Sequence, residues 1–169
     1  MTTRPERRLA AGHWLLASAP SIPDARRQWR DSGSTWLRTG ALYSALMIPA
    51  AVMHAAAQGD GPKECAGRIS DALEGGPVFF DPTSFRQRGG YTLLLPASAA
   101  HTWRVPSTLM HPPGSRVLVP APDRCGWSGS KPWWVVPLES PGLLCSPELV
   151  ACLATLGRRR IVPAGGELL

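Results

Sequence analysis

The sequence predicts a single α+β domain with N-terminal helices, an antiparallel sheet in the second half and a closing C-terminal helix. Short apolar runs that end at proline lie mainly after residue 77, as expected for strands at the rim of a sheet. Apolar residues at helical spacing lie mainly before residue 75 and after residue 145. Eighteen prolines and 17 glycines among 169 residues predict short elements joined by many turns.

Residues 7–18 are expected to form an amphipathic helix, because Leu9, His13 and Leu16 share one helical face. The same region loosely resembles a secretory signal peptide, since arginines precede a short apolar stretch. Glu6 in the basic part and His13 in the apolar part argue against export, so a cytoplasmic protein is expected. No apolar run approaches 18 residues, so no membrane-spanning segment is expected.

The next helix is expected to begin after Ser21, which can cap it, with Pro23 in its first turn. It should end near Gly33. Residues 35–48 alternate in places and are expected to be rich in strand, whereas residues 50–57 fit either a strand or a short helix.

A helix is expected from Pro62 to Leu73, and Glu74-Gly-Gly should end it. Four strands are expected at residues 78–81, 91–95, 116–119 and 133–136. In sequence order they suggest two hairpins, with loops of nine and thirteen residues.

Ser146 and Pro147 should start a last helix that runs to Leu156 and is closed by Gly157. The domain is then expected to span residues 1–160, followed by a flexible tail at residues 161–169.

The four cysteines show neither a CxxC motif nor zinc-ribbon spacing. We expect reduced, mostly buried thiols, whereas a secreted protein could form two disulfides from them. They are Cys65, Cys125, Cys145 and Cys152.

Groups for acid–base or metal catalysis are scattered along the sequence. Asp81 precedes Pro82, which is typical of a turn, although catalytic acids also occur at strand ends. A zinc site from His101, His111 and Cys125 is one alternative. A pocket that brings together Asp81, His101 and His111 would be another, and would favour an enzyme.

The formal charge of +6 is unevenly distributed. Residues 82–122 contain four arginines and no acid, and residues 1–38 contain seven arginines against three acids. Aromatic residues interleave with these arginines, which suits phosphate contact together with base stacking. Arginines on a solvated face and tryptophans in a small core would produce the same pattern. The interleaved aromatic residues are Trp29, Trp36, Phe85, Tyr91 and Trp103. The candidate nucleic-acid or nucleotide-binding residues are Arg86, Arg88, Tyr91, Trp103, Arg104 and Arg116.

A series of short motifs extends along residues 10–160. In order they are Trp36, Pro49-Ala-Ala-Val-Met-His-Ala-Ala, Gly75-Gly-Pro-Val-Phe-Phe-Asp-Pro, Tyr91-Thr-Leu-Leu-Leu-Pro, Trp103-Arg-Val-Pro, Gly114-Ser-Arg-Val-Leu-Val-Pro-Ala-Pro and Trp133-Trp-Val-Val-Pro. This series resembles a group of short actinobacterial, Streptomyces-type proteins. More distantly, the order of elements is similar to the N-terminal domain of bifunctional DNA primase–polymerases of the archaeo-eukaryotic primase superfamily.

Active members of that superfamily are two-metal enzymes, in which acids on one strand and a histidine on the next hold metal and nucleotide. Here residues 49–56 contain no acid and residues 89–93 contain no histidine. Because phosphoryl transfer depends on a liganded metal, the resemblance implies no catalytic residue, no metal and no cofactor. It implies a non-catalytic domain that binds DNA or a nucleotide through a basic surface. The alternative is a protein-interaction or regulatory module without a nucleic-acid role.

Overall fold

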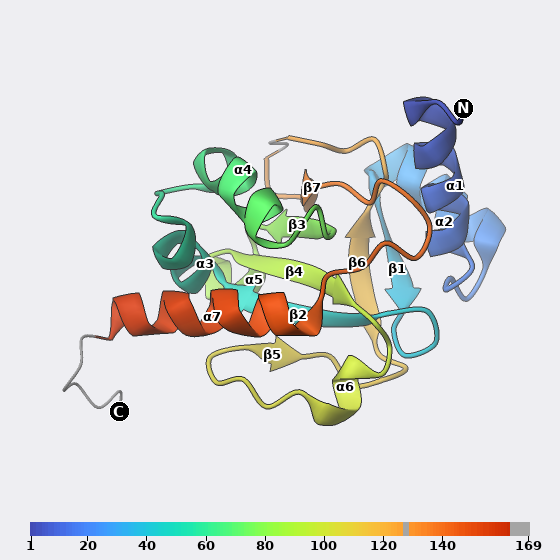
Figure 1. The fold of residues 1–169 in the computed structure, drawn as a ribbon. Helices are drawn as coiled ribbons and strands as arrows, with labels where there is room; N and C mark the ends of the chain where they lie inside the picture. Colours follow the sequence, from blue (N-terminus) through green and yellow to red (C-terminus); the bar gives the residue numbers. More distant parts are fainter. Residues whose placement is uncertain (127–128, 163–169) are drawn as a thin grey trace.

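The computed structural model of the chain describes residues 1–126 and 129–162, and it confirms a single α+β domain (Figure 1). The helices are α1 (Arg4–Leu16), α2 (Ile22–Ser32), α3 (Ala50–Ala57), α4 (Pro62–Ala72), α5 (Ser84–Gln87), α6 (Ala99–Thr102) and α7 (Pro147–Ile161). The strands are β1 (Ser34–Arg38), β2 (Ser44–Pro49), β3 (Val78–Asp81), β4 (Gly90–Leu95), β5 (Leu109–Met110), β6 (Arg116–Pro120) and β7 (Trp133–Val136).

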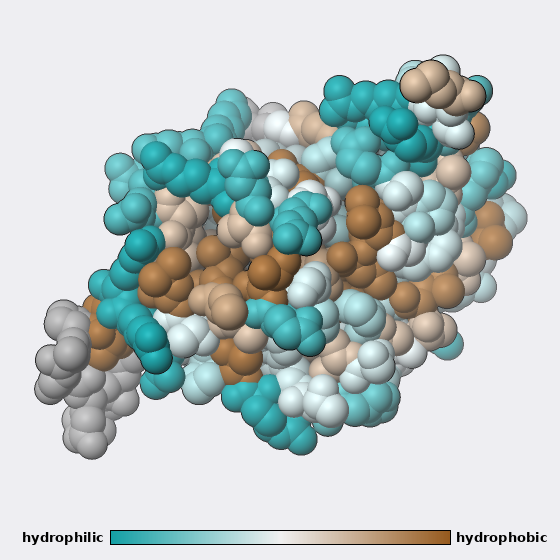
Figure 2. Space-filling model, in the orientation of Figure 1, coloured by the Kyte–Doolittle hydropathy of each residue, from teal (hydrophilic) through white to brown (hydrophobic). Residues whose placement is uncertain are grey.

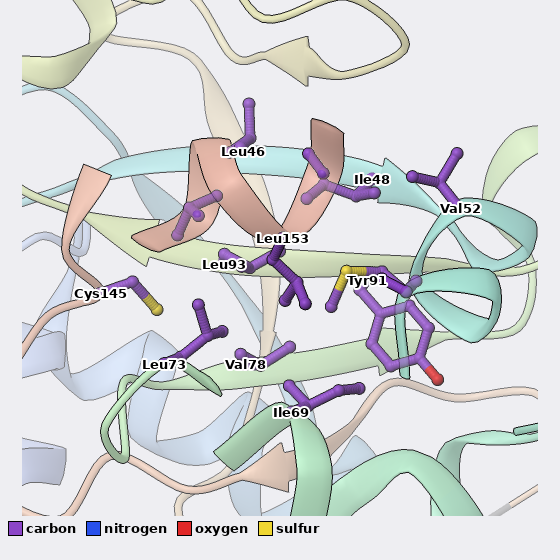
Figure 3. Close-up of a cluster of buried hydrophobic side chains, with 14 of the residues drawn as sticks. Leu46, Ile48, Val52, Ile69, Leu73, Val78, Tyr91, Leu93, Cys145 and Leu153 are labelled. Carbon is purple, nitrogen blue, oxygen red and sulfur yellow. The ribbon is translucent and has the colours of Figure 1, made fainter. Parts of the chain in front are cut away.

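Strand β4 lies at the centre of a five-stranded antiparallel sheet with the order β5-β2-β4-β3-β7. Every residue of β4 is buried, so both faces of the sheet are covered at this strand. Helices α3, α4 and α7 cover one face, where Leu153 of α7 lies beside Leu93 and Val78 of the sheet (Figure 3). Ile69 of α4 joins the same cluster, which forms the larger part of the core.

Strands β1 and β6 form a separate two-stranded antiparallel ribbon, which covers the other face of the sheet together with α1. The ribbon runs across the direction of β2 and β4 (Figure 1). Its inward side chains, Leu37, Val117 and Val119, pack with Leu94 of β4 and Trp134 of β7. The outward side chains of the ribbon are therefore left for solvent or for a ligand.

The predicted pairing of two consecutive hairpins is half right. Strands β3 and β4 pair as expected, but β6 pairs with β1 and β7 pairs with β3. The reason lies in the burial pattern, because β6 has one apolar face whereas β7 is buried along most of its length. A strand buried like β7 must pair within the covered sheet. The Nε1 of Trp134 in β7 donates to the carbonyls of Pro120 and Ala121, which connects β7 to the end of β6.

Several helix boundaries follow local signals. Ser21 and Ser146 cap α2 and α7 as expected, and Gly33 ends α2 with a φ of 78°. Helix α1 begins at Arg4, earlier than predicted, because Thr3 and Glu6 form a reciprocal capping box.

Helix α3 resolves the ambiguity at residues 50–57 in favour of a helix. The Arg160 guanidinium donates to the carbonyls of Ala55 and Ala56, and Arg68 donates to those of Ala57 and Gln58. These bonds satisfy the last carbonyls of a buried helix and place positive charge at the negative end of its dipole.

Gly157 was expected to close the last helix, but α7 continues to Ile161. A Cβ added at Gly157 would overlap the carbonyl oxygen of Val52, so glycine is needed here for the close approach of α7 to α3. The arginines that follow are good helix formers and sit favourably in the last turn. Residues 163–169 of the predicted tail lie outside the described residues.

All four cysteines are free. Cys65 and Cys145 are buried, but Cys125 and Cys152 are exposed, so only half of the thiols lie in the core. Burial raises the pKa of the Cys145 thiol to about 12.

Among the described residues, no helix has the length and apolar character required to cross a membrane. On the face shown in Figure 2, hydrophobic residues gather across the middle of the view and hydrophilic residues lie mainly around the margins.

We expect Gly157→Ala to lower the free energy of unfolding by about 1–3 kcal/mol, because the added methyl group must push α7 away from α3. Urea denaturation of the purified protein measures the change. Gly67→Ala is the matched control: Gly67 is an exposed position within α4 with open space around its Cα, so this variant should gain about 0.5–1 kcal/mol. Equal effects in the two helices would contradict the close-packing role of Gly157.

Burial lowers the pKa of His54, whose Nε2 lies 2.8 Å from the hydroxyl of Tyr91. The unfolded chain therefore binds a proton more readily than the folded chain, and stability should decrease as the pH falls through about 6.5. We expect His54→Gln to weaken this decrease, because the amide can still bond Tyr91 but does not titrate. Urea midpoints between neutral pH and pH 5 measure it, and an unchanged pH slope would contradict the assignment.

Candidate nucleic-acid interface

The outer face of the β1–β6 ribbon presents an aromatic ring between two arginines. Alternation along β1 turns Leu37 inward and places Trp36 and Arg38 on the opposite side. Trp36 is 51% exposed and pairs with Leu118, and Arg38 pairs with Arg116. Because opposed residues in an antiparallel pair share a face, the ring and both guanidinium groups lie on one surface.

The two arginines lie directly opposite each other and are exposed. Within the described part of the chain, neither forms an ion pair with an acid. Like charges placed directly opposite in a sheet are destabilising. An anion bound between Arg38 and Arg116 would remove this repulsion, so the arrangement suits a phosphate.

Trp36 lines two hollows on the surface. The larger, which we call the Trp36 cavity, has a volume of about 470 Å³ and is lined by Gln28, Ser32, Ser34, Trp36, Asp81, Thr83, Leu118, Ser130, Lys131 and Pro132. The smaller, of about 170 Å³, includes Arg116 and Asp24 in its lining. Gln28, like Trp36, lines both hollows. Its Oε1 accepts a hydrogen bond of 2.6 Å from the hydroxyl of Thr35. This bond orients the amide group beside the aromatic ring.

Arg86 and Arg88 lie together in a second basic hollow of about 440 Å³, which the start of α3 also lines. Pro49 precedes α3 and supplies no side-chain cap, so the positive end of the helix dipole adds to the two guanidinium groups. Phe85 and Arg86 adopt left-handed backbone conformations, with φ of 50° and 57°. Such strain is held in place only where the surroundings impose it, and it often accompanies a binding surface.

The other predicted site residues are dispersed. Tyr91 lies fully in the core, where its hydroxyl bonds His54, so its ring offers no face to a ligand. Trp103 is half-buried against the core and donates from Nε1 to the Thr108 hydroxyl. Arg104 is exposed and its guanidinium donates to the carbonyl of Trp103. The structure thus joins Arg86 with Arg88, and places Arg116 on the ribbon beside Trp36.

Sequence reasoning missed Trp36 as a site residue, although it was counted among the interleaved aromatics. It also missed Arg38, Gln28 and Lys131. The alternation of β1 is a signal that could have found the first pair, because Trp36 and Arg38 must share a face if Leu37 is buried. The contribution of α2 and of the segment before β7 depends on long-range packing.

The enzyme alternatives lack a common site. Asp81 accepts bonds from the Thr83 amide and hydroxyl, at 2.8 and 2.7 Å, which fits the turn interpretation. His111 follows β5 at one edge of the sheet. Cys125 forms an isolated β-bridge with Trp134 of β7, at the opposite edge. Across residues 1–126 and 129–162, no three His, Cys, Asp or Glu side chains are grouped as metal ligands.

Neither a protein-family model, nor a curated protein, nor a solved structure matches this chain. The similarity to primase–polymerases therefore stays a prediction.

We expect Arg116→Thr to raise the free energy of unfolding by about 0.2–1 kcal/mol at low salt, because it removes the repulsion from Arg38. The gain should shrink at high salt, where exposed charges are screened. Urea denaturation of Arg38→Thr, Arg116→Thr and the double variant completes a double-mutant cycle. The two gains should not add, since either change alone relieves the repulsion. Additive gains would show that the two charges do not interact.

Proposed function

We propose that this domain binds single-stranded nucleic acid through the outer face of the β1–β6 ribbon. The observation that carries the proposal is the half-exposed ring of Trp36 beside Arg38 and Arg116, which have no acidic partner among the described residues. The arginines would contact phosphates, and the ring would stack with a base.

The aromatic ring favours a single strand over a duplex. A base can stack on a protein side chain only after it has left its own stack, and in a single strand this costs little. Such stacking contributes about 1–3 kcal/mol per base. Phosphate contacts supply the remaining attraction and make it depend on salt.

The second basic hollow extends the proposed surface. The segment from Asp81 to Gly89 begins at the Trp36 cavity, to which Thr83 contributes, and continues to Arg86 and Arg88. A strand that crosses this segment would meet both pairs of arginines. Beyond Asp81, the stretch of residues 82–122 supports this path, because it contains no carboxylate that would repel phosphate. A cytoplasmic location is part of the proposal, and the four free thiols support it.

We expect a fluorescent deoxyoligonucleotide to bind at low salt and to lose affinity linearly with the logarithm of salt concentration. Two to four phosphate contacts predict a slope of about −1.4 to −2.8. Trp36→Ala should weaken binding by about 5- to 100-fold, and Arg38→Ala or Arg116→Ala should reduce the magnitude of the slope by about 0.7 each. Fluorescence anisotropy across a salt series measures all three.

Arg159→Ala is the control, because it removes one exposed positive charge from the end of α7, away from the ribbon. This variant should bind with nearly the same affinity and slope as the unaltered protein. Absence of binding at low salt, or equal losses in the Arg159 and Arg116 variants, would overturn the proposal.

A protein partner is the second candidate, and one feature favours it. Helices α1 and α2 enclose a mainly apolar hollow of about 380 Å³, whose lining includes Leu9, Leu16 and Trp29. Leu9, which lines this hollow, is 62% exposed. This hollow would accept an apolar side chain of a bound protein, independently of the ribbon.

A further inference from the structure

The Trp36 cavity contains polar groups that backbone phosphate binding does not use. Its volume of about 470 Å³ lies within the range of small-molecule sites, about 300–1,000 Å³. Its lining combines the aromatic ring with the amide of Gln28, the hydroxyl of Ser34 and the carboxylate of Asp81. A ring with convergent donors and acceptors suits a flat, polar-edged ligand better than a phosphate.

Ser34 is a buried polar residue in the lining of this cavity. It is only 7% exposed, and its hydroxyl has no hydrogen-bond partner in the described part of the protein. Buried polar groups are nearly always hydrogen-bonded, because an unpaired one destabilises the folded state. Ser34 lines the cavity, but its hydroxyl oxygen has almost no accessible surface, so the side chain must rotate toward a ligand to bond it.

The neighbouring polar groups are oriented by bonds to the protein. The Thr35 hydroxyl occupies Oε1 of Gln28, which leaves the amide nitrogen to donate. Both bonds from Thr83 reach Oδ1 of Asp81, which leaves Oδ2 to accept. The cavity therefore offers a donor, an acceptor and a hydroxyl that can act as either.

Charges around the cavity separate a base from its phosphate. Asp81 in the lining repels phosphate, whereas Arg116 lines the smaller hollow, which Trp36 and Asp24 also line. The Lys131 ammonium lines the cavity and donates to the Ser32 carbonyl at 2.8 Å. A nucleotide could thus place its base in the cavity and its phosphate near the arginine.

We propose that the Trp36 cavity is a nucleobase subsite, in which a base stacks on Trp36 and presents an exocyclic amino group to Asp81. This inference rests on the proposed nucleic-acid function and adds base selectivity to it. Cytosine, adenine and guanine carry such an amino group, and thymine and uracil do not, so an amino-bearing base is preferred over thymine or uracil. The shared chemistry is an amino-bearing base, for which cytosine is the probe, whether it belongs to a strand or to a free nucleotide.

The test compares oligo-deoxycytidine with oligo-deoxythymidine of equal length, by anisotropy at one salt concentration. We expect the cytosine strand to bind about 3- to 10-fold more tightly, as one or two hydrogen bonds would provide. Asp81→Asn keeps an oxygen for Thr83 but offers an amide in place of the carboxylate, so the preference should fall to near unity. Trp36→Ala should weaken binding of both strands.

Ser34→Ala separates a ligand role from a structural one. Because the hydroxyl has no partner in the free protein, its removal should leave the urea midpoint unchanged or higher. It should nevertheless weaken binding of the cytosine strand by about 3- to 10-fold. A stability gain without a change in affinity would overturn the role assigned to Ser34.

Calorimetry with cytidine and uridine monophosphate identifies the source of the base. Binding of cytidine monophosphate, lost in Asp81→Asn, without binding of either strand would support the subsite and overturn the strand proposal. Equal binding of both strands that still requires Trp36 would support the proposed function and overturn the base subsite. Absence of binding to strands and nucleotides alike would overturn both.

Discussion

The burial of β4 on both faces is the constraint on which the rest of the fold depends. A strand whose six residues are all buried needs a layer on each side of its sheet. Helices α3, α4 and α7 provide one layer, and they meet closely because Gly157 lets α7 approach the carbonyl of Val52. The β1–β6 ribbon provides much of the other. One face of the ribbon therefore packs against the core, and the other face is exposed and available to bind a ligand.

Local signals in the sequence predicted where helices α2, α4 and α7 begin. Ser21 and Ser146 act within three residues of themselves, so their capping could be predicted without knowledge of the fold. The partners of β6 and β7 could not, because the choice depends on which strand must be covered by elements distant in sequence. The role of Gly157 also depends on an element distant in sequence. Only the position of α3 distinguishes a glycine needed for close packing from one that ends a helix.

The same distinction explains the candidate site. Tyr91 and Trp36 both lie in strands near arginines, but β4 is covered on both faces and β1 on one. An aromatic residue in β4 therefore becomes core, whereas one on the outer face of β1 becomes a platform. Arg86 and Arg88 line one hollow, and a single residue separates them in sequence. The pairing of Arg38 with Arg116 required the register of the ribbon.

The arginines of the chain also fall into two groups, those that stabilise the fold and those on the exposed face of the ribbon. Arg68 and Arg160 donate hydrogen bonds to the last carbonyls of α3, so they stabilise the fold. Arg38 and Arg116 face each other across the ribbon, where their charges oppose folding. Because a solvent-facing ribbon could carry neutral residues at both positions, a destabilising pair is better explained by binding than by stability. An arginine near an exposed aromatic ring therefore indicates function only where its hydrogen bonds do not stabilise the fold.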